Sequence, residues 1–168
     1  MPRSKKVEAL PPFEESVLPA QRGDSIACDE VWAYVGSKKQ QAWLWLSWSY
    51  QSTQTLSFSV GARDEATGRK MWEGIPKSYS RKQAYTDEYA VYGNLIPWWR
   101  HWVCPKGCGG TNIAEGCNNY LRHRVSYLVR KSPSFARNRD WLERRLSFVL
   151  FTRNLRIKQT YMSTPETT

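Results

Sequence analysis

The sequence lacks any apolar run long enough to cross a membrane, and its charged start at residues 1–6 is not followed by the apolar segment of a signal peptide. It contains only two His and four Cys. Without an export signal, the four Cys favour reduced thiols over a disulfide framework. No internal repeat or low-complexity tract is visible. We therefore expect a cytoplasmic globular protein, and exclude membrane-spanning and disulfide-rich secreted classes.

Acidic residues are scarce in the last third of the chain. Only Asp140 and Glu143 stand against eleven Lys or Arg between residues 120 and 158, so this segment carries most of the net charge of +10. A concentrated basic segment in an otherwise balanced chain is typical of a partner rich in phosphate, such as a nucleic acid. The alternative is a solvated helical face.

Aromatic and apolar residues are plentiful, at 14% and 40% of 168 residues, which predicts one folded domain. Proline and mixed charge without periodicity predict a flexible N-terminal arm over residues 1–25. The domain itself is expected over residues 26–153. Residues 154–168 are expected to form a disordered C-terminal tail.

Apolar patterning predicts the order of the elements. Three aromatic or alternating runs indicate an antiparallel meander, and a helix, a short fourth strand and further helices follow. The expected strands are 26–35, 42–50, 56–60 and 83–86, and the expected helices are 64–75, 88–95, 112–129 and 135–151. This is an α/β fold with a mixed sheet, in which three antiparallel strands are followed by a parallel strand and flanked by helices. The order matches the ribonuclease-H-like fold.

Three acidic residues stand at positions that a metal site would need. Asp29 lies inside an apolar strand, Asp87 directly follows the fourth strand, and Glu115 falls in the first turn of a long helix. A buried carboxylate requires a partner, and the carboxyl ends of strands are where α/β folds hold ligands. Each residue also has a structural alternative: a turn contact for Asp29, a helix N-cap for Asp87 and a favourable helix-start charge for Glu115.

If the three carboxylates converge, their mutual repulsion calls for cations between them. Oxygen ligands without His or Cys select Mg²⁺ or Mn²⁺ over zinc. Two such ions can activate an attacking oxygen and stabilise a leaving one in phosphodiester chemistry. That chemistry agrees with the basic segment.

The motifs around these acids resemble those of a known family. The runs Asp29 to Gly36, Tyr85 to Asp87 and Thr111 to Glu115, followed by the basic run Asn118 to Ser132, are similar to the insertion-sequence-one family of DDE transposases. The resemblance covers about residues 26–151. It implies a metal-dependent enzyme for DNA transposition and recombination, with Asp29, Asp87 and Glu115 as catalytic, metal-binding residues.

The resemblance also implies DNA-binding residues. Arg122 follows Glu115 by seven positions, close to two helical turns, so the two share a helix face and the guanidinium can grip a phosphate near the metal. We expect the phosphate backbone to be held by Arg122, Arg124, Arg130 and Lys131. His101 matches a family histidine or is an ordinary surface residue.

Several partners follow from the resemblance. It implies element ends and target DNA as partners, a homo-oligomer on DNA, an upstream zinc-finger and helix-turn-helix region, and a place at the prokaryotic nucleoid. The chain departs from the family at Gly116 and Cys117, directly after the third acid. A catalytically inactive relic that keeps nucleic-acid binding is therefore an alternative, and a ribonuclease or resolvase of the same fold is another.

The cysteines offer a second possible metal site. Cys104 and Cys108 are separated by three residues, Cys117 follows, and His101 is the nearest further ligand. Structural zinc sites use two well-separated ligand pairs, a spacing that is irregular here. Free thiols are the competing interpretation.

Overall fold

The computed structural model describes residues 10–105, 109–128 and 136–163. Its centre is a five-stranded sheet in the order β3-β2-β1-β4-β5. The strands are β1 (Ile26–Val35), β2 (Ser37–Ser49), β3 (Thr55–Gly61), β4 (Ala84–Thr86) and β5 (His101–Val103). Strands β1, β2 and β3 pair antiparallel, whereas β4 pairs parallel to both β1 and β5.

The mixed sheet predicted from the sequence is therefore present, with one strand more than predicted. Strand β5 has only three residues, His-Trp-Val, within a connection rich in Trp, Pro and Gly. Such a run is too short for a period-2 pattern to identify. β2 also begins earlier than predicted, because the polar residues 37–41 extend the hairpin beyond the buried core.

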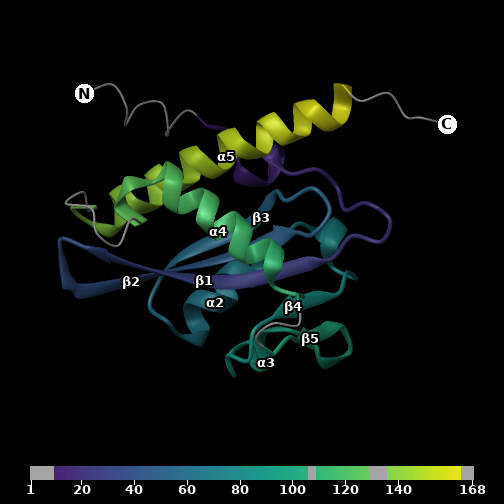
Figure 1. Cartoon of the computed structure of the whole chain (residues 1–168), viewed down its shortest axis with the longest axis horizontal. Helices are drawn as coiled ribbons and strands as arrows, with labels where there is room; N and C mark the ends of the chain where they lie inside the picture. The colour runs from purple at the N-terminus through teal and green to yellow at the C-terminus, as the bar shows by residue number, and fades with distance from the viewer. Residues whose placement is uncertain (1–9, 106–108, 129–135, 164–168) are drawn as a thin grey trace.

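Helices cover both faces of the sheet (Figure 1). Helices α4 and α5 lie on one face, and α2 and α3 lie on the other. The α-helices are α2 (Glu65–Glu73), α3 (Tyr92–Leu95), α4 (Asn112–Arg124) and α5 (Arg139–Ser163), and the short 3-10 turns are η1 (Phe13–Ser16), η2 (Lys77–Tyr79), η3 (Trp98–Arg100) and η4 (Ser126–Leu128). The predicted helix 88–95 is helical only over its second half, and the helix predicted to reach 129 ends at Arg124.

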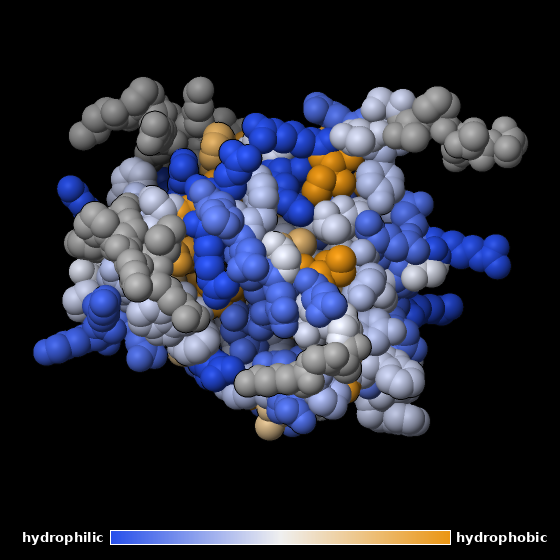
Figure 2. Space-filling view, in the orientation of Figure 1, coloured by the Kyte–Doolittle hydropathy of each residue, from blue (hydrophilic) through white to orange (hydrophobic). Residues whose placement is uncertain are grey.

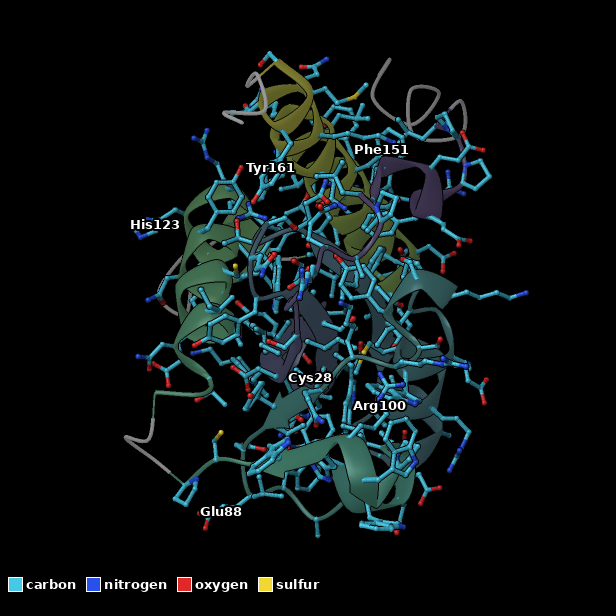
Figure 3. The ribbon with its side chains drawn as sticks, turned by 90° about the vertical axis from the view of Figure 1, so that its right-hand side faces the viewer. Cys28, Glu88, Arg100, His123, Phe151 and Tyr161 are labelled. Atoms are coloured by element: carbon cyan, nitrogen blue, oxygen red, sulfur yellow. The ribbon has the colours of Figure 1, made fainter. Side chains whose placement is uncertain are left out.

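Alternate side chains of β1 serve two separate cores. Ala27 and Val31 pack with α4 and α5, whereas Ile26 and Cys28 pack with α2 and α3. Strand pleating explains this division, because successive side chains point to opposite faces. Burial raises the pKa of the Cys28 thiol, so this residue behaves as an apolar core residue. Figure 3 shows it in the middle of the sheet.

The flexible N-terminal arm predicted for residues 1–25 is wrong for residues 10–25. The ring of Phe13 lies 5.2 Å from that of Phe58 and 6.5 Å from that of Phe151. Gln54 donates a hydrogen bond to the carbonyl of Ser16, and Asp24 is buried, accepting one from the Ser49 hydroxyl at 2.8 Å. These contacts hold the segment against the sheet and α5, and residues 1–9 lie outside the described part.

The disordered tail predicted from residue 154 is also wrong, since α5 continues to Ser163. Asn154 is fully buried and its side chain bonds both the N–H and the carbonyl of Thr55, at 3.0 and 2.8 Å. Asn154 is a polar residue on the buried side of α5, where it pairs with the start of β3. It therefore interrupts the apolar periodicity from which the sequence predicted the end of the helix. Figure 3 shows Phe151 and Tyr161 along this helix.

Among the described residues, no helix combines the length and the apolar character needed to span a bilayer.

Candidate metal centre

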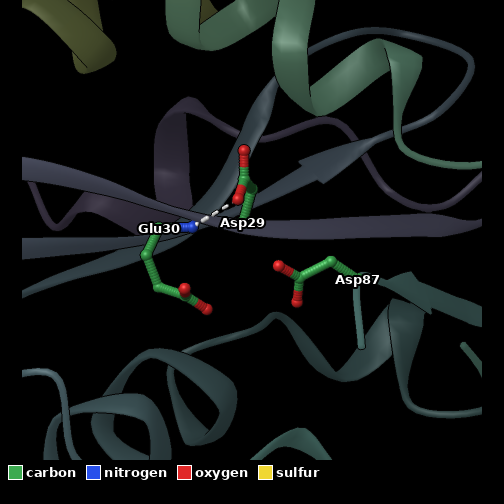
Figure 4. Close-up of side chains that lie close together, drawn as sticks. All are labelled: Asp29, Glu30 and Asp87. Carbon is green, nitrogen blue, oxygen red and sulfur yellow. Dashed lines mark hydrogen bonds between the residues drawn. The ribbon is translucent and has the colours of Figure 1, made fainter. Parts of the chain in front are cut away.

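The parallel pairing of β1 and β4 brings two predicted acids together. Ile26 pairs with Ala84 and Ala27 with Tyr85. Continuing this register by two residues places Asp29 opposite Asp87, just beyond the end of β4. The Asp29 side chain points toward α4, whereas the Asp87 carboxylate lies beside β1 near that of Glu30 (Figure 4). One oxygen from each lies within 4.8 Å of the other.

Asp29 is held by two hydrogen bonds. Its Oδ1 accepts the backbone N–H of Glu30 at 2.8 Å, and its Oδ2 accepts the side-chain amide of Asn118 at 2.7 Å. Burial raises the pKa of Asp29 to about 6, assisted by the charges of Glu30 and Asp87 and opposed by the two hydrogen bonds. Asn118 is itself buried and lies on α4, so the helix fixes the carboxylate from above.

Glu30 joins the two aspartates, which the sequence did not predict. Neighbours in a strand point to opposite faces, so Asp29 and Glu30 were not expected at one site. Because β4 ends at Thr86, the edge of β1 beyond it is open, and the longer Glu30 side chain extends toward Asp87 (Figure 4). Asp29, Glu30 and Asp87 each offer an oxygen within 4.8 Å of the others.

Only one of the two carboxylate oxygens of Glu30 is held by an ion pair. Its side chain is 2% exposed, and Oε2 pairs with Arg63 at 3.1 Å. The Arg63 guanidinium lies over the rings of Trp43 and Tyr89, 4.6 and 4.2 Å from their centroids. Among the described residues Oε1 has no partner at full hydrogen-bond geometry, although the Tyr92 hydroxyl faces this carboxylate. Burial raises the pKa of Glu30, the Tyr92 hydroxyl and Arg63 lower it, and the charge of Asp87 raises it.

Asp87 is anchored through the loop that follows β4. Its Oδ1 accepts the N–H of Tyr89 at 3.0 Å, which caps a turn and not the helix α3, because α3 begins at Tyr92. The Thr86 hydroxyl donates to the Asp87 carbonyl and lies 2.8 Å from Nε2 of His101. Burial lowers the pKa of His101, which is thereby kept as a neutral hydrogen-bonding group beside the loop.

Glu115 is not part of this group of carboxylates. It lies in the first turn of α4, as predicted, and its side chain is exposed. It precedes Asn118 by one helical turn, so it sits on the same end of the helix as the residue that contacts Asp29. Nothing lies within 4 Å of an ideal Cβ at Gly116, so a side chain there would meet open space.

The predicted phosphate-binding residues are only partly described. Arg122 is half-buried and donates a hydrogen bond to Asn119 at 3.3 Å, and the Arg124 guanidinium lies 5.5 Å from the Tyr120 ring. His123 projects outward from α4 (Figure 3), and hydrophilic residues gather along that helix (Figure 2). Arg130 and Lys131 lie outside the described residues.

The predicted zinc ligands do not form a described cluster. Cys104 and Cys117 are both buried, and Sγ of Cys117 contacts the Thr53 carbonyl and the Arg153 guanidinium, at 3.8 and 3.9 Å. Cys108 lies outside the described residues, so the Cys104–Cys108 pair stays a prediction. Within residues 10–105, 109–128 and 136–163, the carboxylate group is the one set of three or more ligand residues brought together.

Comparison with known proteins places the chain in a family. Residues 25–154 match the family model described as IS1 transposase. The chain belongs to the IS1 transposase family. It is 30% identical over 110 residues to the insertion element iso-IS1n protein InsB of Shigella dysenteriae, covering 66% of this chain and 81% of that protein. It is 29% identical over 119 residues to the insertion element IS1 4 protein InsB of Escherichia coli, covering 68% of each. Family membership supports a transposase role.

Proposed function

We propose that this IS1 transposase family member cleaves DNA and transfers the strand in a divalent-cation-dependent reaction, with Asp29 and Asp87 at the reacting centre. The observation that carries the proposal is the β1–β4 register, which sets these two carboxylates face to face beside Glu30. We also infer that the fold is ribonuclease-H-like, because three antiparallel strands are followed by a strand parallel to the first.

The residues present suit a hard divalent cation. Three carboxylates at this separation repel one another, and the buried Oδ1 of Asn118, whose amide contacts Asp29, has no hydrogen-bond partner among the described residues. We assign Asp29, Asp87 and Glu30 as the residues that would hold Mg²⁺ or Mn²⁺, with Glu115 approaching from α4. When bound, the ions would lower the pKa of an attacking water or hydroxyl and stabilise the leaving oxygen.

The remaining residues would orient the substrate. Asn118 fixes the Oδ2 atom of Asp29, and Arg63 fixes Oε2 of Glu30, so that neither carboxylate can rotate freely. Arg122 and Arg124 on α4, together with Arg130 and Lys131, would hold the DNA backbone. In the cleavage step, one P–O bond breaks to release a 3′-hydroxyl as water supplies the new P–O bond. The freed hydroxyl then attacks a phosphodiester of the target DNA, so that one P–O bond forms as another breaks and releases a 3′-hydroxyl of the target strand.

Further features of the proposal come from the family. We propose element ends and target DNA as partners, a homo-oligomer on DNA, an upstream zinc-finger and helix-turn-helix region, and action at the nucleoid. A binding protein without catalytic activity is the second candidate, favoured by the exposed position of Glu115 and by Gly116 beside it.

Nicking of a supercoiled plasmid tests the catalytic proposal without knowledge of the element ends. With Mn²⁺, we expect the wild type to nick the plasmid and Asp87→Asn to be slower by at least about 100-fold, as loss of a cation ligand requires. Glu88→Gln is the matched control, because Glu88 is the adjacent exposed acid. Nicking that survives in Asp87→Asn, or that never exceeds a protein-free sample, would favour the binding protein.

A further inference from the structure

An uncovered aromatic strip lies on the sheet beside the carboxylates. Trp102 on β5 is 58% exposed, whereas Trp45 and Trp48 in β2 are fully buried. Trp102 pairs in register with Tyr85 on β4, so the two side chains share a face. The Tyr85 ring lies 6.1 Å from that of Tyr50. We call Tyr50, Tyr85 and Trp102 the aromatic strip.

The strip lies on the same face of the sheet as Asp29. Tyr85 pairs with Ala27, which precedes Asp29 by two residues on β1, and Asp87 follows Tyr85 by two residues, just after β4 ends. Strand spacing puts the Cα of Trp102 about 8 Å from that of Asp87. Figure 1 shows α4 over β1 and β2, with β4 and β5 beyond its end. The aromatic side chains thus cross the sheet from its β5 edge, and Tyr85 lies two residues before Asp87 of the candidate metal centre.

A hollow adjoins the strip. A pocket of about 460 Å³ is lined by Ser25, Tyr50, Tyr85, Gly109 and Gly110. Its lining combines two phenol rings with a hydroxyl and backbone of the segment that precedes α4. A flat aromatic group with hydrogen-bonding edges suits such a lining.

The strip rests on a fixed backbone. Nε1 of Trp102 donates to Oε1 of Gln83 at 2.7 Å, which holds the indole along the sheet. Arg100 is buried and donates hydrogen bonds to the carbonyls of Tyr79 and Ser80. Because β5 is tied to the loop before β4, an exposed Trp here retains its orientation. The Trp102 indole is thus both exposed and held in one orientation, as a surface for base stacking needs to be.

Basic residues lie in the loop that leads into the strip. The loop that enters β4 carries Lys77, Arg81 and Lys82 and has no acid between residues 77 and 86. The chain as a whole is +10. Aromatic faces beside basic groups are the combination that binds single-stranded nucleic acid, where bases stack and cations track the phosphates.

We infer that the aromatic strip and its pocket bind unpaired DNA nucleotides next to the phosphate that is cut, with one base stacked on Trp102 and Tyr85. The inference rests on the proposed function for the identity of the polymer. The inference also specifies the form of the DNA, since a base can reach these rings only when it is unpaired and unstacked from the duplex. The strand would run from the basic loop, across the strip, to Asp87.

Fluorescence anisotropy of labelled oligonucleotides in EDTA tests this inference independently of catalysis. We expect Trp102→Ala to weaken binding of a single-stranded oligothymidylate by about 5- to 100-fold. Duplex binding should change less than about twofold, because phosphate contacts dominate it. Trp102→Phe should restore most of the affinity, since it restores a stacking face, and Tyr85→Leu should weaken binding in the same direction.

Trp141→Ala is the matched control, because Trp141 is 45% exposed on α5, away from the strip. Equal losses in Trp141→Ala and Trp102→Ala would overturn the inference, as would unchanged binding in both Trp102→Ala and Tyr85→Leu. A change in sedimentation without a change in oligonucleotide affinity would assign the strip to a protein interface and also overturn it. Asp87→Asn should keep the single-strand affinity, so that failure of catalysis and failure of the strip are distinguishable.

Discussion

The acids on the sheet and the acid on helix α4 are held in different ways. Asp29 and Asp87 are placed by a strand ladder and fixed by hydrogen bonds from Asn118 and the Tyr89 N–H. Glu115 stands on an exposed helix turn outside the group they form. Strand pairing therefore brings two carboxylates together, whereas the third predicted acid stands apart from them on a helix. Variants of each kind test that difference.

Removing a sheet carboxylate should have the largest effect. We expect Asp87→Asn to lower Mn²⁺ affinity by about 100-fold or more, since even an indirect contact to a metal ligand is worth 10- to 100-fold. Titration calorimetry measures the affinity, and Glu88→Gln serves as the control. Equal Mn²⁺ affinity in the two variants would remove Asp87 from the ligand set.

Asp29→Asn should stabilise the metal-free protein. The folded-state pKa of Asp29 is about 6, above the ordinary 3.8, so ionisation in the fold is unfavourable. Stability is lost as pH rises from about 4 to 6, and the loss persists above that window. In EDTA at pH 7.5, thermal or urea unfolding should show a gain of about 1–3 kcal/mol for Asp29→Asn.

The same gain should shrink as the pH falls below about 6 and vanish near pH 3, where Asp29 is protonated in both states. Glu88→Gln is the control for general loss of negative charge. A variant less stable than the wild type at pH 7.5 would mean that the carboxylate is better solvated than its burial indicates.

Asn118→Ala should have an intermediate effect, because this residue acts on the cation only through Asp29. We expect about a tenfold loss of Mn²⁺ affinity. Asn119→Ala is a matched control, because Asn119 is the neighbouring exposed amide on α4. Losses of the same size in both variants would show that helix stability, and not the hydrogen bond to Asp29, is responsible.

Glu115→Gln should have the smallest effect on cation binding. Without DNA, we expect less than about a threefold change in Mn²⁺ affinity, because screening weakens an exposed charge outside the ligand group. A loss as large as that of Asp87→Asn would show that α4 carries Glu115 into the site once a cation is bound. Calorimetry with and without DNA separates these cases.

The sequence predicted the parts of the fold that follow from pleating and strand order. A short apolar run in 26–35 and strict alternation in 56–60 identified strands, and an acid directly after a short strand predicted Asp87 at the sheet edge. Asp29 was predicted as a site residue because a carboxylate buried in an apolar strand is costly without a partner. These features depend on local pattern alone.

Other features depend on where a strand stops in space. Glu30 reaches the site only because β4 ends at Thr86 and leaves the edge of β1 open. Strand β5 was too short for a pattern, and Asn154 made α5 appear to end early. The sequence pattern alone did not single out Asn118. Because residues three positions apart share a helix face, its position one turn after Glu115 is the feature that could have indicated it.

Anomalous diffraction from crystals soaked in Mn²⁺ tests the central claim most directly. The account predicts a manganese peak bonded to carboxylate oxygens of both Asp29 and Asp87, with Glu30 turned toward it. No peak at these carboxylates at saturating Mn²⁺, or a peak bound only by other residues, would contradict a cation-dependent reaction centre at the end of β4.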